Sequence, residues 1–204
     1  LEMFPGAHLQ VLWNNAPRRF ERQVHETWLA RTPLRRHKSL ALPFMPPTWR
    51  QLNHAERFDW ILVSSHLFAH HVRLRRQTGL PKLVYAHTPA RYIWEPDLDT
   101  RGDAFPARIA AAALKPLDKK RSAEALSIAA NSQFTRQRIE RTWGREAVVI
   151  HPPVDTERIA GVASWPERLS APEQEWLGKL PDAFILGASR FVAYKRLELV
   201  IRAG

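Results

Sequence analysis

The chain of 204 residues contains no cysteine and no long apolar segment. Without cysteine, disulfide scaffolds, thiolate metal sites and cysteine nucleophiles are excluded, although this absence does not identify a compartment. No apolar run approaches the roughly 20 residues that cross a bilayer, and the N-terminus lacks the basic-then-apolar pattern of a signal peptide. We therefore predict a cytoplasmic protein.

Basic residues, in contrast, are abundant, and the formal net charge is +11. A basic surface attracts nucleic acid, anionic lipid headgroups or phosphorylated small molecules. Arginines that serve only as surface residues are an equal alternative. The net charge therefore does not decide among these three classes of partner.

Short apolar runs alternate with segments of helical spacing, which is typical of an α/β fold with a Rossmann-like parallel sheet and flanking helices. Most of the runs are almost continuously hydrophobic, as strands buried on both faces are. We predict strands at residues 8–13, 60–64, 82–87, 126–130, 147–150 and 183–188. We predict helices at residues 67–77, 106–124 and 133–143. Gly79 and Gly144 are expected stops for the first and last of these helices.

A change of composition divides the chain into parts. Prolines interrupt a polar segment between Pro152 and Pro181, where we expect an interdomain connection. The predicted organisation is an N-terminal acceptor-side domain at 1–151, a connection at 152–182 and the start of a second domain at 183–204. The chain opens on the last turn of a helix and closes inside another, so we expect a fragment without the first strand and most of the second domain.

The first candidate site follows the predicted strand at 82–87, whose carboxyl end delivers His87. Ligands of open parallel sheets bind at the carboxyl ends of the strands. A histidine there can donate a hydrogen bond to a sugar or phosphate oxygen, and a structural histidine is the competing interpretation. The next residues suit a carbohydrate cleft, or else form a loop that packs its aromatic rings into the core. They are Arg91, Tyr92, Trp94 and Glu95.

A second candidate site follows the predicted strand at 183–188. The loop there carries Arg190 and Lys195 and leads into an apolar-periodic helix that starts at Leu197. Backbone amides, the positive end of a helix dipole and two cations form a diphosphate-binding arrangement, although a solvated basic helix start is the plain alternative. The loop is neither a Walker motif nor a G-x-G-x-x-G, so nucleotide hydrolysis and dinucleotide binding lose support.

Four strings in order resemble the motifs of one enzyme family. The string GASRFVAYKRLELVI at 187–201 resembles the donor-phosphate motif of the retaining glycosyltransferases of family 4. YAHTPARYIWE at 85–95, ANSQFT at 130–135 and VIHPPVDT at 149–156 resemble a branch of that family that includes bacterial mannosyltransferases of surface polysaccharide assembly. Together the strings cover the chain from about Asp59 to its end.

The resemblance implies the GT-B arrangement, in which two Rossmann-like domains face each other across a cleft with the acceptor on the N-terminal side. It implies that Arg190 and Lys195 hold the donor diphosphate and stabilise the leaving nucleoside diphosphate, with His87 near the transferred sugar. It implies no metal and no cofactor, and transfer with retention by front-face attack. Asn131 and Ser132 end another strand and line the cleft, although a helix N-cap is the more natural role for Ser132.

The sequence also departs from the family pattern. The glycine-rich loop after the first strand and the paired glutamates of the donor domain do not occur in it. His151 stands where an aromatic residue such as tyrosine is expected. We therefore expect the enzyme to be the full-length protein, and this chain to be inactive by itself.

The predicted function is transfer of a hexosyl group, mannosyl being the specific suggestion, from a nucleotide sugar to a glycan or lipid-linked acceptor. Basic and apolar residues mix between Pro17 and Trp49, which suits peripheral contact with an anionic membrane at its inner face, whereas a helical hairpin packed on its own sheet is the alternative. A UDP-sugar epimerase of the same architecture and a basic nucleic-acid-binding module are the competing functions. The aromatic residues fall beside apolar runs rather than among basic ones, so we expect no nucleic-acid partner.

Overall fold

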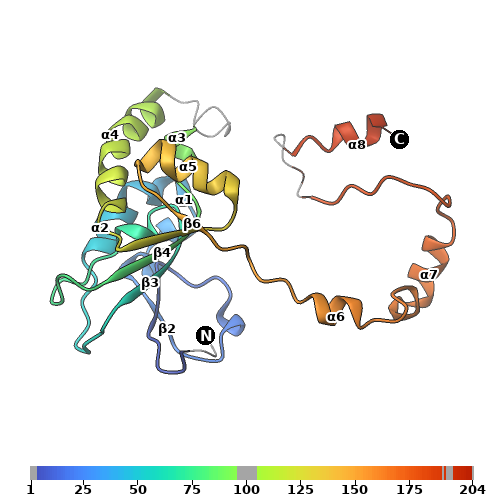
Figure 1. Cartoon of the computed structure of the whole chain (residues 1–204), viewed down its shortest axis with the longest axis horizontal. Coiled ribbons are helices and arrows are strands. Elements are labelled where there is room, and N and C mark those ends of the chain that lie inside the picture. The colour runs from blue at the N-terminus through green and yellow to red at the C-terminus, as the bar shows by residue number, and fades with distance from the viewer. Residues whose placement is uncertain (1–3, 96–104, 190, 192–194, 204) are drawn as a thin grey trace. The chain divides into compact units, whose positions relative to one another are not determined.

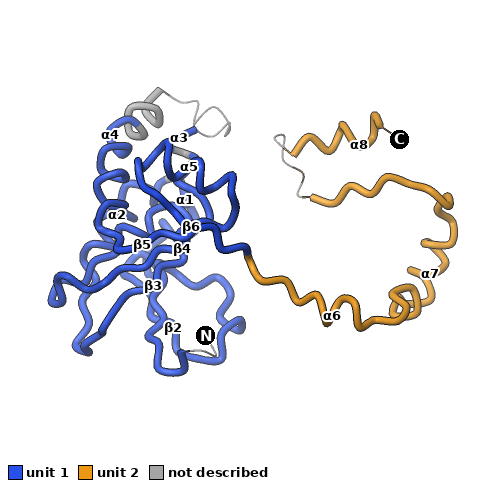
Figure 2. The backbone as a smooth tube through the Cα atoms, viewed as in Figure 1, with its two compact units in different colours: residues 1–151 blue, residues 152–204 orange. Residues whose placement is uncertain are grey.

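The computed structural model describes residues 4–95, 105–189, 191 and 195–203 (Figure 1). The chain forms two compact units, Leu1–His151 and Pro152–Gly204, each of which is described by itself (Figure 2). None of the described helices is long and apolar enough to cross a membrane.

The first unit is built on a four-stranded sheet in the order β3-β4-β5-β6, and every neighbouring pair is parallel. Its strands are β3 (Ile61–His66), β4 (Lys82–Thr88), β5 (Ser127–Ala130) and β6 (Val148–Val149). A separate parallel pair is formed by β1 (Leu9–Val11) and β2 (Val24–Glu26). Five predicted strands are thus present, with bounds that shift by at most two residues. Parallel direction places the four carboxyl ends of the main sheet along one edge.

The two longer helices lie together on one side of this sheet (Figure 1). Helix α5 (Gln133–Trp143) has the predicted bounds, because the Ser132 side chain accepts a bond from the backbone of Thr135 at its start and Gly144 ends it with a φ of 65°. Helix α4 (Phe105–Ser122) packs against α5. The prediction of an α/β fold with a parallel sheet and flanking helices is confirmed.

The remaining helical segments are short. Those of the first unit are η1 (Pro17–Arg19), η2 (Trp28–Arg31), η3 (Pro33–Arg35), α1 (Lys38–Ala41), η4 (Leu42–Phe44), α2 (Met45–Arg50), η5 (Ala69–His71) and α3 (Arg91–Trp94). Those of the second unit are α6 (Thr156–Ala160), η8 (Pro166–Arg168), α7 (Ala171–Leu177) and α8 (Glu198–Ala203).

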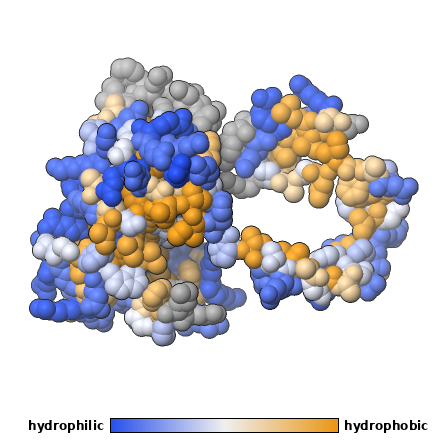
Figure 3. Space-filling model, viewed as in Figure 1, coloured by the Kyte–Doolittle hydropathy of each residue, from blue (hydrophilic) through white to orange (hydrophobic). Residues whose placement is uncertain are grey.

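Only one face of the main sheet is fully covered, so the expectation of burial on both faces is wrong for this unit. Val63, Val84 and Ile128 are buried on the face toward the helices. On the other face Leu62 remains 56% exposed and Val148 remains 58% exposed. Figure 3 shows hydrophobic residues gathered on the surface over this part of the sheet.

Two predicted elements are absent. Residues 67–77 contain only the short η5, because the backbone beyond it pairs with an earlier segment: Arg73 N donates to Trp49 O and Arg75 N donates to Leu52 O. Residues 183–188 form no strand, since this extended segment has no neighbouring strand among the described residues of its unit.

A buried carboxylate lies among the helices of the first unit. Asp118 of α4 is fully buried, and its Oδ1 accepts a bond from His71 Nε2 at 3.0 Å. His70 Nε2 lies 3.2 Å from the same oxygen. Burial raises the pKa of Asp118, and the neighbouring histidines lower it by more, so the carboxyl stays ionised. Burial lowers the pKa of His71 to about 4 against the opposing pull of Asp118, so this ring is neutral at pH 7.

The lowered pKa of His71 predicts a stability that falls in mild acid. The unfolded chain takes up this proton near pH 6.5 and the folded chain only near pH 4, so protonation favours unfolding as the pH falls through that window. The loss contributed by His71 is about 3 kcal/mol across the window, at about 1.4 kcal/mol per pKa unit. Urea unfolding of the chain and of His71→Gln between pH 7 and 4.5 measures it. The Gln variant should lose less stability on acidification, and an unchanged pH slope contradicts the assignment.

Candidate functional site

The predicted site residue His87 lies at the carboxyl end of β4, on the less covered face of the sheet. Its Nε2 lies 2.9 Å from Ser64 Oγ of the neighbouring strand β3. The Tyr85 ring meets the His87 ring edge to face at 5.3 Å between centroids. The backbone oxygen of His87 accepts a bond from Thr135 Oγ1 of α5 at 3.3 Å. Contacts from β3 and β4 thus hold the half-buried imidazole, and the contact from α5 holds the backbone of His87.

Positive charge gathers around this edge of the sheet. A register shift at Ser65/His66 sets His66 opposite Thr88, one residue beyond His87. Burial is the largest cause that lowers the pKa of His66, and the positive fields of His87, Arg91 and Lys38 lower this pKa further. Because these fields reach the imidazole of His66, the cationic side chains of Arg91 and Lys38 lie near the carboxyl end of β3. Such a neighbourhood attracts an anionic ligand group.

The start of α5 adds backbone polarity beside His87. Asn131 N donates to Ala86 O of β4 at 3.3 Å, which ties the turn before α5 to the carboxyl end of β4. Ser132 Oγ accepts from Thr135 N at 3.2 Å and lies 3.3 Å from Asn131 Oδ1. Ser132 is therefore the N-cap of α5. The positive end of the helix dipole lies at the same sheet edge as His87.

The segment after His87 is tied to α5 at its far end. Glu95 Oε2 lies 3.1 Å from Arg138 Nη2, and Arg138 is only 4% exposed. Glu95 is thus half of an ion pair, whereas the sequence suggested a cleft acid. Arg91 is half-buried at the start of α3. The Tyr92 side chain lies outside the described residues.

The predicted donor-binding residues fall in the second unit. Arg190 lies outside the described residues. Lys195 is exposed and lies three residues before α8. Gly187 packs closely against α8, because a Cβ on it would come within 3.1 Å of the Val200 side chain. The structure thus brings His87, Arg91, Asn131 and Ser132 together in the first unit and describes Lys195 separately.

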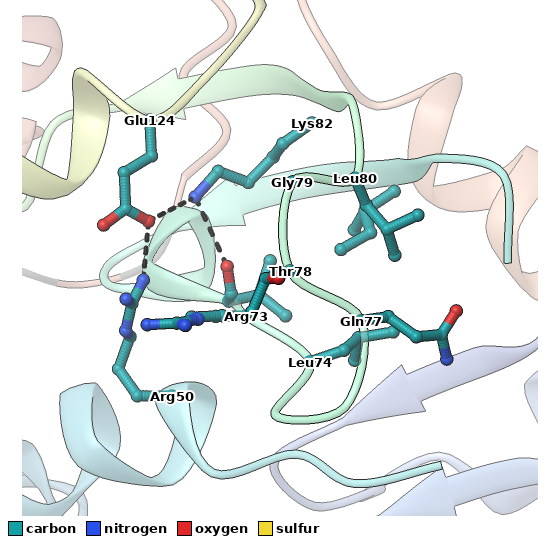
Figure 4. Close-up of a pocket in the computed structure, with 11 residues that line it drawn as sticks. Arg50, Arg73, Leu74, Gln77, Thr78, Gly79, Leu80, Lys82 and Glu124 are labelled. Carbon is teal, nitrogen blue, oxygen red and sulfur yellow. Dashed lines mark hydrogen bonds and ion pairs between the residues drawn. The ribbon is translucent and has the colours of Figure 1, made fainter. Parts of the chain in front are cut away.

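A cavity of about 280 Å³ lies at the opposite end of β4 (Figure 4). Lys82, the first residue of that strand, is 4% exposed there, and its Nζ lies 3.3 Å from Glu124 Oε2. Arg50 Nη1 lies 2.5 Å from the same oxygen. Although burial raises the pKa of Glu124, its bonds with Arg121 and Arg50 bring it down to about 2. The charged groups that line this cavity pair with one another, and the cavity lies at the end of β4 away from His87.

Sequence reasoning missed three residues of the site. Ser64 and His66 lie at the carboxyl end of β3, and the rule that selected His87 applies to that strand equally. No sequence pattern indicated Arg138, because its ion-pair partner Glu95 lies far from it in the sequence.

The model of Glycosyltransferase Family 4 matches residues 5–158, which include the whole sheet and the edge with His87. The chain belongs to this family. Neither the curated proteins nor the solved structures contain a match. As a family 4 glycosyltransferase, the protein is a transferase with a sugar donor and an acceptor as substrates. The match ends before Lys195. It therefore supports the family assignment of the first unit, and the donor-binding role of Arg190 and Lys195 stays a prediction.

Proposed function

We propose that the full-length protein transfers a hexosyl group, with retention, from a nucleotide-diphosphate sugar to a glycan or lipid-linked acceptor in polysaccharide biosynthesis. The observation that supports this most is the electropositive carboxyl edge of the sheet, where His87 lies beside Arg91 and the start of α5. A sugar presents hydroxyl groups to such an edge and a donor presents phosphate oxygens. For the hexosyl group that is transferred, mannosyl is the most specific suggestion.

The proposed chemistry divides between the two units. A bond forms from an acceptor hydroxyl oxygen to the anomeric carbon while the bond to the donor phosphate oxygen breaks, and the hydroxyl proton passes to the leaving diphosphate. His87 donates a hydrogen bond to the transferred sugar. Lys195 and Arg190 neutralise the charge that grows on the nucleoside diphosphate, the role a divalent ion has in other transferases, so neither a metal nor a cofactor is part of the proposal.

Lys195→Ala tests the donor half of this proposal. A charge-assisted bond to phosphate contributes about 1.5–3 kcal/mol, so the variant should bind its nucleotide sugar at least about tenfold more weakly. Lys179→Ala is a matched control, because Lys179 of the same unit pairs with Glu175 Oε1 at 2.7 Å on an exposed surface. Calorimetric titration of the full-length protein measures both. Equal affinities of the Lys195 variant and the control contradict the donor-site assignment.

The first unit has an exposed apolar patch at Trp28 and Phe44, which are 50% and 44% exposed, and Leu40 of the same segment is 61% exposed. The Trp28 and Phe44 rings meet edge to face at 6.3 Å. Lys38 lies in this segment, and its positive charge is one of the fields that lower the pKa of His66. We propose that the patch supports peripheral contact with an anionic membrane at its cytoplasmic face. Vesicle sedimentation with and without anionic lipid tests it, and the absence of binding at any salt concentration rejects it.

A further inference from the structure

The buried carboxylate of Asp118 gathers N–H groups from several segments. Its Oδ2 accepts bonds from the indole nitrogens of Trp94 on α3 and Trp143 on α5, each at 2.7 Å. Its Oδ1 faces His70 and His71 of η5. A single side chain of α4 therefore connects three other helical segments. A fully buried charge is tolerated only when it is satisfied in this way.

A metal ion is the competing occupant of this cluster. His70, His71 and Asp118 form the one group of described side chains whose ligand atoms all lie within 4.8 Å of one another. A structural centre needs four ligands, and a catalytic one needs an open position for water. Here the three candidate ligands are at most 1% exposed, which leaves no path for water as a fourth ligand. Both oxygens of Asp118 already accept N–H bonds. The geometry favours a carboxylate held by N–H donors.

Trp94 links this cluster to the candidate site. It is the last residue of α3, a helix that starts with Arg91 and is followed by Glu95. A helix of four residues does not hold its own conformation in water, so α3 depends on its tertiary contacts. Those contacts are the buried Ile93, the bond from Trp94 to Asp118, and the ion pair of Glu95 with Arg138.

We propose that Asp118 is a positioning residue of the transfer site: through Trp94 its carboxylate fixes α3, so that Arg91 stays at the edge where His87 lies. This inference rests on the proposed function for its effect on transfer. Its structural half, the anchoring of α3, stands separately. Trp143 binds the same oxygen but lies at the C-terminal end of α5, away from Ser132 and the site.

Trp94→Phe and Trp143→Phe form a matched pair of variants. Each removes one indole N–H from the same carboxylate oxygen and keeps an aromatic ring. Trp143 is 2% exposed and Trp94 is half-buried, so the Trp143 variant should lose at least as much stability. Trp94→Phe should lower kcat/KM of the full-length protein by about 10- to 100-fold, because misplaced substrate-positioning groups cost rates of that order. Trp143→Phe should lower it by less than about threefold.

Hydrogen exchange measured by mass spectrometry supplies a readout without substrate. Backbone amides of residues 88–95 should exchange faster in Trp94→Phe and at the wild-type rate in Trp143→Phe. Equal exchange in both variants, or equal loss of kcat/KM, overturns the proposal. If the exchange difference appears and the wild-type protein transfers no hexose, the proposed function fails and the anchoring stands. One equivalent of bound metal by elemental analysis, lost in His70→Gln, overturns the N–H-donor interpretation.

Discussion

His87→Ala is expected to lower kcat/KM for hexosyl transfer by about 100-fold, the usual cost of removing one preorganised hydrogen-bond donor from a reacting centre. The imidazole is held between Ser64 Oγ at 2.9 Å and the edge of Tyr85, so it keeps its geometry before substrate binds. Its backbone oxygen contact with Thr135 does not depend on the side chain. The variant should therefore keep the fold, with a nearly unchanged unfolding temperature. A transfer assay with saturating acceptor measures the effect.

Ser64→Ala is the graded control for this prediction. It removes the contact of His87 Nε2 while keeping the imidazole itself, so the loss of kcat/KM should be smaller than about tenfold. His87→Gln keeps a donor on a different side chain and should recover part of the rate. A His87→Ala variant that transfers hexose within twofold of the wild type shows that this histidine is structural.

Asp118→Ala is expected to have the largest effect on stability, a loss of about 3–5 kcal/mol in the free energy of unfolding. Alanine leaves two indole N–H groups and the His71 N–H buried without an acceptor, and it also opens a cavity between α4 and α5. Urea unfolding followed by tryptophan fluorescence measures the loss, since Trp143 reports on this region directly.

Asp59→Ala is the matched control, because Asp59 is an exposed aspartate of the same unit. It should change the free energy of unfolding by less than about 0.5 kcal/mol. A loss below about 1 kcal/mol in Asp118→Ala contradicts the view that this carboxylate holds the helices together. Such a result would also remove the physical basis for the anchoring of α3.

The fold was predictable where local chemistry decides it. The bounds of α5 follow from the N-cap at Ser132 and the left-handed turn at Gly144, both of which are visible in the sequence. The helix predicted at 67–77 was wrong, because Arg73 and Arg75 donate their backbone N–H groups to residues of the 49–52 segment, a distant pairing that no periodicity reveals. The strand predicted at 183–188 needed a neighbouring strand that the described residues of its unit do not provide.

The candidate site was predictable only for residues whose position at the end of a single strand is visible in the sequence. His87 follows from the rule that ligands meet the carboxyl ends of parallel strands. The contribution of His66 depends on a register shift between β3 and β4, and the ion pair of Glu95 depends on Arg138, far along the chain. The Asp118 cluster likewise joins residues 47 positions apart in the pair with His71. Such contacts arise from packing, which a sequence pattern of period 2 or 3.6 does not encode.

The most direct test of the central claim is the thermal unfolding of the full-length protein with GDP- and UDP-hexoses. A ligand that binds only the folded state stabilises it by about 2.7 kcal/mol at 100 times its dissociation constant. At least one nucleotide hexose should therefore raise the unfolding temperature by a clear margin, and the free hexose at the same concentration should not. If no nucleotide hexose raises it, this protein is not the hexosyltransferase proposed here.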